Sequence, residues 1–242
     1  MLKLATGIIP ARYNSQRFPG KPLALIQGKS MIQRVYEATK TSKFLDHLII
    51  ATDDLRIFEA AEKFGADVRM TSTDHLSGTE RVAEVAKEIQ SSIVINIQGD
   101  EPLLRGEMIN DLVIALQDES IPMATLAAEV NNSSLLYENN VVKVTTDKKG
   151  FALNFFRSPL SSKESDFFFQ HIGIYGYQKD FLQTFCKIPP SKLEKEENLE
   201  QLRALENGYK IKIIISQFLT LSVDTPQDII KVENYLKQNT ND

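Results

Sequence analysis

Three cations stand close together near the start of the chain, where a buried strand is expected to end. Arg12, Arg17 and Lys21 lie within the segment PARYNSQRFPGKP, together with the hydroxyl of Ser15. The apolar run at 4–9 predicts the strand. Open α/β sheets bind ligands beyond the carboxyl ends of their strands, and cations with free backbone N–H groups suit phosphate oxygens. The loop therefore favours a polyphosphate ligand over the plainer alternative, a solvated basic loop.

Two aspartates are also placed for chemistry. Asp100 follows the strongest predicted strand, beside Gly99, which lets a ligand approach the backbone. Asp224 lies late in the chain in the segment VDTP, where a helix is expected to begin. Each could merely cap the helix that follows it. Together with a phosphate-binding loop, the pair favours Mg²⁺, a hard ion that takes oxygen ligands.

A third candidate segment consists of Ser77, Gly78 and Thr79 and opens a predicted helix. Its backbone groups and small hydroxyls could form hydrogen bonds with the edge of a nucleotide base. An ordinary N-cap explains Ser77 equally well. Arg81 follows on the same helix, where it fits either a surface cation or an anion clamp. The spacing leaves both alternatives open.

The elements that position these residues alternate regularly in the first half of the chain. Three strand–helix repeats in a row predict right-handed crossovers and a mostly parallel sheet. The predicted strands are 4–9, 48–51, 66–70 and 93–97, and the predicted helices are 30–40, 55–64, a helix opening within 71–81 and ending near 90, and 107–116.

The pattern changes after residue 120. His171 and Tyr175 lie four residues apart in one predicted strand, so they share a face of it. We expect one compact domain, 1–242, with an inserted mixed-sheet lobe at about 121–190. Predicted here are strands at 123–130, 141–146, 151–156, 171–178 and 211–215, a hairpin turn at 148–150, a charged helix at 194–207 and a last helix from 225 to about 236.

Composition narrows the class of protein. The chain has 242 residues, of which 42% are hydrophobic and 25% charged, as in ordinary globular proteins. The net charge of −4 argues against nucleic-acid binding. The single cysteine, Cys186, permits no internal disulfide and fits a reducing cytoplasm. No apolar run is long enough to span a membrane, and the start leaves no room for a signal peptide. We expect a soluble, cytoplasmic protein.

Several longer segments together carry a resemblance. The chain resembles the 3-deoxy-manno-octulosonate (Kdo) cytidylyltransferases, or CMP-Kdo synthetases, nearly from end to end. The segments that carry it are PARYNSQRFPGKPL, ATDD, DHLSGTERVAEV, INIQGDEPL, FRSP, HIGIYGY, LEQLRALENGYKI and VDTPQDI. The resemblance implies an α/β, Rossmann-like nucleotidyltransferase fold with a mostly parallel central sheet flanked by helices and a smaller mixed-sheet dimerisation lobe.

The same resemblance implies roles for individual residues. The enzyme would join CTP to Kdo, releasing pyrophosphate and giving CMP-Kdo for lipopolysaccharide synthesis, as a cytoplasmic homodimer that binds neither nucleic acid nor membrane. Asp100 and Asp224 would hold Mg²⁺, and Arg12 and Lys21 would stabilise charge on the phosphates. The implied CTP contacts are Arg12, Ser15, Arg17, Lys21, Ser77, Gly78 and Thr79, and the implied sugar contacts are Arg81, Gln98, Arg157, His171, Tyr175, Glu200 and Gln201.

One stretch departs from the family pattern. Members carry a longer, often basic or aromatic loop after the FRSP segment, whereas residues 160–170 here read LSSKESDFFFQ. The alternatives are therefore the same reaction on 8-amino-Kdo or sialic acid, and a non-catalytic nucleotide-binding module. His75, ahead of Ser77, fits the Kdo-using pattern. A sugar 1-phosphate enzyme would show a glycine-rich first loop, which this chain lacks.

Overall fold

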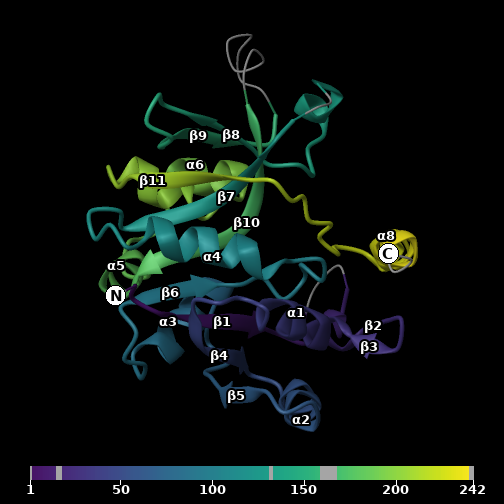
Figure 1. The fold of residues 1–242 in the computed structure, drawn as a ribbon. Helices are drawn as coiled ribbons and strands as arrows, with labels where there is room; N and C mark the ends of the chain where they lie inside the picture. The colour runs from purple at the N-terminus through teal and green to yellow at the C-terminus, as the bar shows by residue number, and fades with distance from the viewer. Residues whose placement is uncertain (1, 15–17, 131–132, 159–167, 240–242) are drawn as a thin grey trace.

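The strands of the computed structural model form one large sheet, drawn in Figure 1. The structure describes residues 2–14, 18–130, 133–158 and 168–239. The order of the main strands is β11-β7-β10-β6-β1-β4-β5, and β8 and β9 branch from β10. Four of the pairings along the main order are parallel, namely β11 with β7, β6 with β1, β1 with β4, and β4 with β5. The expected α/β fold with a mainly parallel sheet is thus confirmed.

The first half of the chain supplies the parallel core of this sheet. Its strands are β1 (Ala5–Ala11), β4 (Leu45–Thr52), β5 (Asp67–Met70) and β6 (Ile93–Asn96). In β1, Ile8 packs in one apolar cluster and Ile9 in another, because successive side chains point to opposite faces of the sheet. Both faces are therefore covered, which explains why these strands read as continuous apolar runs.

The residues expected in an inserted lobe extend the same sheet. They form β7 (Met123–Glu129), β8 (Lys143–Thr146), β9 (Ala152–Phe156) and β10 (Phe169–Gln178). β10 runs antiparallel to both β6 and β7, and β8 and β9 make an antiparallel hairpin at its amino end. β11 (Ile211–Ser216) then pairs in parallel with β7.

Helices cover the two faces and begin where the capping residues allow. The side chain of Ser30 accepts from Gln33 N, that of Asp54 from Arg56 N, and that of Ser77 from Glu80 N. The longer helices are α1 (Met31–Thr39), α2 (Leu55–Lys63), α3 (Gly78–Ala86), α4 (Gly106–Ala115), α5 (Lys179–Phe185) and α8 (Pro226–Asn239). Two short 3₁₀ helices are η1 (Lys21–Leu23) and η2 (Ser133–Tyr137). A small separate hairpin consists of β2 (Leu25–Ile26) and β3 (Lys29–Ser30).

The prediction of a single charged helix at 194–207 is wrong. The structure has two short helices there, α6 (Lys192–Glu197) and α7 (Leu202–Glu206). Asn198 ends α6 in the left-handed region, with φ of 54°, a conformation that asparagine tolerates better than most residues. The break turns Glu200 and Gln201 toward a cavity that a continuous helix would not line in this way.

Candidate active site

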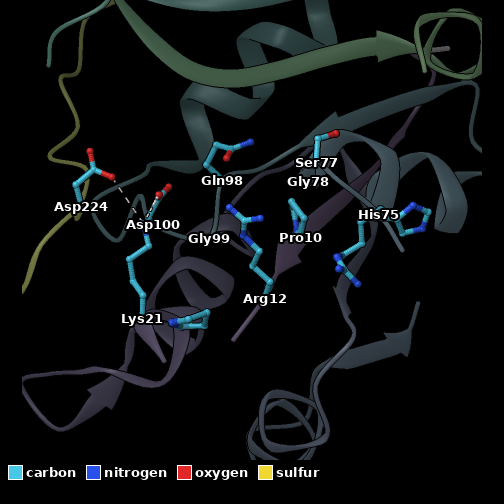
Figure 2. A pocket seen from close by; sticks show the side chains of 13 residues that line it. Pro10, Arg12, Lys21, His75, Ser77, Gly78, Gln98, Gly99, Asp100 and Asp224 are labelled. Atoms are coloured by element: carbon cyan, nitrogen blue, oxygen red, sulfur yellow. Dashed lines mark hydrogen bonds and ion pairs between the residues drawn. The ribbon is translucent and has the colours of Figure 1, made fainter. Parts of the chain in front are cut away.

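A cavity of about 240 Å³ lies beyond the carboxyl ends of β1 and β6. Figure 2 shows it from close by. Arg12 and Lys21 of the basic loop meet Asp100 and Asp224 here, although Asp224 lies more than 200 residues from either cation in sequence. The lining residues are Pro10, Ala11, Arg12, Lys21, Pro22, His75, Ser77, Gly78, Arg81, Gln98, Gly99, Asp100 and Asp224.

Two glycines allow this close assembly. A Cβ atom on Gly78 would lie 3.2 Å from Cγ of Pro10, and one on Gly99 would lie 3.1 Å from the Pro10 carbonyl oxygen. The start of α3 and the loop after β6 therefore both pack directly against the end of β1. Backbone groups at this point become accessible to a ligand because no side chain intervenes.

Lys21 is the central cation of the cavity. Its Nζ atom donates to Asp100 Oδ2 at 2.6 Å and to the Val223 carbonyl at 2.9 Å, and it lies 3.9 Å from Asp224 Oδ1 (Figure 2). Arg12 also lines the cavity, and among the described residues its guanidinium has no carboxylate partner. It is therefore available to an anion. Ser15 and Arg17, the other two predicted phosphate contacts, lie outside the described residues.

The donor set around Lys21 fits a divalent cation. Asp100 and Asp224 present carboxylate oxygens, which are the ligands that Mg²⁺ prefers, and the position of the Lys21 ammonium shows that positive charge is favoured between them. No cluster of three or more histidine, cysteine or acidic ligands occurs in the described ranges. Two protein ligands suit an ion whose remaining positions are filled by nucleotide phosphates and water.

Arg81 lies at this cavity and is absent from the lining of the second cavity described below. Its side chain is almost fully buried and donates to Asp53 Oδ2 at 2.6 Å and to the Thr71 hydroxyl. These contacts tie α3 to the segments that follow β4 and β5. The guanidinium is therefore held in place before any ligand binds.

A second cavity, of about 380 Å³, opens beside the first. It shares Gln98, Asp100 and Asp224 with the first cavity, so the two meet at the acidic pair. Five more of the predicted site residues lie here, including Thr79, which was expected beside the nucleotide. The lining residues are Thr79, Gln98, Asp100, Glu101, Asn140, Val141, Val142, Gln170, His171, Ile172, Gly173, Tyr175, Asn198, Leu199, Glu200, Gln201, Thr220, Ser222 and Asp224.

A chain of hydrogen bonds connects the two cavities. Gln98 Nε2 donates to Asn96 Oδ1 at 3.3 Å, Asn96 Nδ2 donates to the Thr79 hydroxyl at 3.3 Å, and that hydroxyl donates to Glu200 Oε2 at 2.5 Å. Gln201 is 3% exposed, and its Nε2 atom has no hydrogen-bond partner among the described residues. A polar ligand group bound in the cavity would satisfy this buried donor.

His171 lines the second cavity as a neutral ring. Burial, with a smaller contribution from the positive charge of Arg157, lowers the pKa of His171 to about 3. Its Nε2 atom lies 3.0 Å from the Thr125 hydroxyl, which itself donates to the Ile174 carbonyl at 2.8 Å. Because a hydroxyl has one proton, the Thr125 oxygen accepts from His171 Nε2–H. The Nδ1 atom is thus the acceptor.

The sequence did not lead us to expect Glu101 among the site residues. Burial, reinforced by the charge of Asp100, raises the pKa of Glu101 to about 8, and burial also raises the pKa of Glu200. The four carboxyls that line the second cavity therefore carry less negative charge near neutral pH than their number implies. The one available signal was the position of Glu101 directly after Asp100, at the end of the strongest strand.

Arg157 lines neither cavity. Its guanidinium donates to the carbonyl oxygens of Glu197 at 3.1 Å and Asn139 at 3.2 Å, which directly precede two lining residues of the second cavity, Asn198 and Asn140. Its positive charge makes a smaller contribution than burial to the lowered pKa of His171, which lines the second cavity.

The fold and the joined cavities define a nucleotide-binding α/β protein with an acidic pair at its centre. A family model described as cytidylyltransferase matches residues 6–213. A protein from Syntrophotalea carbinolica named 3-deoxy-manno-octulosonate cytidylyltransferase is 49% identical over 96% of this chain and 98% of its own length. One of the same name from Thermodesulfovibrio yellowstonii is 45% identical over 95% and 96%. The chain belongs to the cytidylyltransferase family and, within it, to the 3-deoxy-manno-octulosonate cytidylyltransferases.

Solved structures agree with this assignment. A CMP:2-keto-3-deoxy-manno-octonic acid synthetase complexed with CTP has a TM-score of 0.91 and 39% identity, covering 97% of this chain and 99% of that one. A 4-diphosphocytidyl-2C-methyl-D-erythritol synthase from Anaerococcus prevotii, at 16% identity, shares the fold with a TM-score of 0.66 over 97% and 99%. In the described part of this chain no helix is both long and apolar enough to cross a membrane.

Proposed function

We propose that this protein transfers a cytidylyl group from CTP to Kdo, giving CMP-Kdo and pyrophosphate. The names of the relatives and the CTP complex of the similar structure support this reaction. The observation that carries it here is the junction of two cavities at Gln98, Asp100 and Asp224. One cavity has the lysine and arginines that suit a triphosphate, and the other has the hydroxyl, amide and carboxyl groups that suit a polyhydroxylated sugar.

The nucleotide would occupy the first cavity. Arg12 and Lys21 would bind the phosphates, with the start of α3 at Ser77 and Gly78 near the base and ribose. Lys21 is already held by Asp100 and by the Val223 carbonyl, so its ammonium is oriented before the substrate arrives. Such preorganised charge stabilises the negative charge that develops in a phosphoryl-type transfer.

Kdo would occupy the second cavity. The acceptor Nδ1 of His171, the unpaired donor Nε2 of Gln201 and the carboxyl of Glu200 would bind its hydroxyls and carboxylate. Gln98, which lines both cavities, would orient the acceptor toward the nucleotide. The two buried carboxyls with raised pKa values, Glu101 and Glu200, lessen the repulsion between this cavity and an anionic sugar.

In the reaction, the 2-hydroxyl oxygen of Kdo forms a bond to the α-phosphorus of CTP. The bond from that phosphorus to the bridging oxygen breaks, pyrophosphate leaves, and the hydroxyl proton passes to solvent. Positioning and charge neutralisation are the main demands of such a transfer. The cavities provide both, the reaction as written needs no nucleophilic side chain, and Cys186 lines neither cavity.

Asp100 and Asp224 would hold Mg²⁺. When bound there, the ion would neutralise phosphate charge and lower the pKa of the attacking hydroxyl. Both carboxylates lie where the cavities meet, and Lys21 supplies the cation that keeps them together in the free protein. The expected cofactor is therefore consistent with the donor set.

The proposal is tested by pyrophosphate release with Mg²⁺ and CTP, with and without Kdo. Parallel reactions replace CTP by ATP or UTP, and Kdo by 8-amino-Kdo or sialic acid. Release that requires Kdo and prefers CTP is the expected result. Release with another acid sugar alone would keep the reaction and replace the substrate, and the absence of release with every sugar would favour a non-catalytic nucleotide-binding module.

We also infer that the enzyme is a cytoplasmic homodimer, with the lobe at 121–190 as its contact. Two large apolar side chains are exposed there, Tyr137 and Leu153, which are 74% and 64% exposed. Single exposed apolar residues are ordinary, so these two support the inference only if they form one surface that a second copy covers. Sedimentation of the wild type should show twice the monomer mass of 27.3 kDa. Leu153→Asp should shift the equilibrium toward the monomer, and a monomeric wild type would contradict the inference.

A further inference from the structure

Lys143 lies in β8 with a side chain that is fully buried, an unusual place for a lysine. Burying an ammonium group costs free energy unless strong hydrogen bonds replace those that it made with water. The residue lines neither cavity, and the reaction proposed above gives it no part. The groups that it contacts must therefore explain why a lysine is found here.

The partners of Lys143 in the described part of the chain are two backbone carbonyls. Its Nζ atom donates to the Glu138 carbonyl at 2.6 Å and to the Arg157 carbonyl at 2.7 Å. Such short distances are typical of hydrogen bonds from a charged donor. One ammonium group thus joins the stretch that follows η2 to the end of β9.

The two carbonyls bear directly on the position of the Arg157 side chain. One belongs to Arg157 itself, so Lys143 fixes the backbone that carries the guanidinium. The other belongs to Glu138, and the carbonyl of the next residue, Asn139, accepts from Arg157 Nη1 at 3.2 Å. The Glu138 carbonyl also accepts from Val141 N–H at 3.0 Å, which closes the turn that contains Asn139. Lys143 therefore holds both the origin of this arginine side chain and one of its end points.

A second, exposed bond joins the same two stretches. The Ser158 hydroxyl donates to Asn139 Oδ1 at 2.6 Å. Residues 140–142, which follow, line the second cavity, and the Val142 carbonyl accepts from His171 N–H at 2.9 Å. The junction that Lys143 makes is thus continuous with the wall of the second cavity.

We propose that Lys143 is a positioning residue whose buried ammonium group sets where the Arg157 guanidinium lies and so contributes to binding of the acid sugar. Ser158 assists it at the surface. The inference rests on the proposed function, since it takes the second cavity to be the site of Kdo. An apolar side chain of similar length would avoid the cost of burying a charge but would leave both carbonyls without this donor, so the lysine favours this role.

The test uses the full-length protein and three single variants. Lys143→Met keeps the length of the side chain and removes its donors, and Ser158→Ala removes the exposed bond without changing the interior. Lys148→Met is the matched control, because Lys148 is exposed at the turn between β8 and β9. Two quantities are measured: the KM values for Kdo and CTP from pyrophosphate release, and amide hydrogen exchange of residues 138–142 without substrates.

Lys143→Met should raise the KM for Kdo about fivefold, leave the KM for CTP unchanged and speed exchange in 138–142. Ser158→Ala should raise the KM for Kdo about twofold, and Lys148→Met should match the wild type. Lys143→Met/Arg157→Ala should have the same KM for Kdo as Arg157→Ala alone, because both changes remove one interaction with the sugar.

A wild-type KM for Kdo in Lys143→Met, equal changes in both KM values, or additive losses in the double variant would overturn the inference. Where Lys143→Met does not fold, Ser158→Ala decides, and a wild-type KM for Kdo in that variant would also overturn it. A wild type that releases no pyrophosphate with Kdo, but faster exchange in Lys143→Met, would contradict the proposed function and with it the role in Kdo binding, while confirming that Lys143 holds this stretch.

Discussion

At the scale of single residues, the site depends on charges that are paired before any substrate binds. Lys21 lies between Asp100 and Asp224 and also bonds to the backbone of Val223. These side chains are only partly buried, so water and salt screen much of the charge that a substitution leaves unpaired. Substitutions here should therefore affect turnover much more than folding.

Asp100→Asn should lower turnover at least about a hundredfold, equivalent to roughly 2.7 kcal/mol of transition-state stabilisation. The amide keeps the shape of the side chain but gives up a negative charge that Mg²⁺ requires. Steady-state pyrophosphate release measures the loss, and the circular dichroism spectrum should be unchanged. Asp180→Asn, on the exposed surface of α5, is the control. Near-normal turnover in Asp100→Asn would remove Asp100 from the metal site.

Arg157→Ala should raise the KM for Kdo roughly tenfold, about 1.4 kcal/mol, with little change in the KM for CTP. The guanidinium bonds to the Asn139 carbonyl, next to Asn140 of the second cavity, and its charge contributes to the lowered pKa of His171. Initial rates with each substrate varied in turn separate the two constants. A change confined to CTP would show that Arg157 serves the nucleotide.

His171 should make the fold less stable as the pH falls. Its pKa is about 3 in the folded protein against 6.5 as the ordinary value, so between these pH values the unfolded chain binds more protons. The free energy of unfolding should therefore decrease below pH 6.5, by at most about 1.4 kcal/mol per pH unit from this group. Urea denaturation at pH 7 and pH 5 should show a smaller decrease for His171→Gln than for the wild type. His47→Gln, at an exposed position, should match the wild type.

At the scale of elements, close packing decides where helices begin. The amino end of α4 lies against the turn that follows α1, and a Cβ atom on Gly106 would come within 2.5 Å of the backbone of Thr41 and Ser42. The hydroxyl of Thr41 also accepts from Gly106 N at 3.2 Å. The helix was expected over 107–116, and in the structure it begins one residue earlier. Because glycine is a weak helix former, this start depends on the close tertiary contact.

Gly106→Ala should therefore destabilise the protein by roughly 1–3 kcal/mol, the usual range for overpacking. Chemical denaturation measures the change. Glu107→Ala, at the next and exposed position, should have little effect. A neutral result for Gly106→Ala would mean that α1 and α4 can separate without cost.

At the scale of the whole molecule, the two ends of the chain complete one site. Val223 and Val232, from the last part of the chain, pack with Ile26 and Met31 from the first. α8 is consequently held next to the hairpin of β2 and β3 (Figure 1). A ligand that bridges Lys21, Asp100 and Asp224 stabilises contacts between distant segments.

CTP with Mg²⁺ should therefore raise the melting temperature. At a ligand concentration about 100 times the Kd, linkage gives roughly 2.7 kcal/mol, or about 5–10 °C for a chain of this size. Differential scanning calorimetry measures the shift. Asp100→Asn should retain the part due to CTP alone and lose the additional part due to Mg²⁺. An equal shift in both proteins would place the ion elsewhere.

The sequence by itself determined the alternation of elements and the chemistry of the candidate groups. Buried parallel strands read as continuous apolar runs, and Ser30, Asp54 and Ser77 begin helices where capping residues predict them. These features are local, so they can be recognised from a few neighbouring residues. The segments that carried the family resemblance added the reaction and its substrates.

Only the tertiary structure decided which groups meet. It joined the strands expected in a lobe to the central sheet, broke the charged helix at Asn198, and turned Thr79 toward the second cavity. It also enclosed Glu101 beside Asp100 at the second cavity. Burial and contact between residues more than a hundred positions apart depend on how all the elements pack. Neither can be obtained from the order of neighbouring residues, because desolvation and distance are properties of the folded chain.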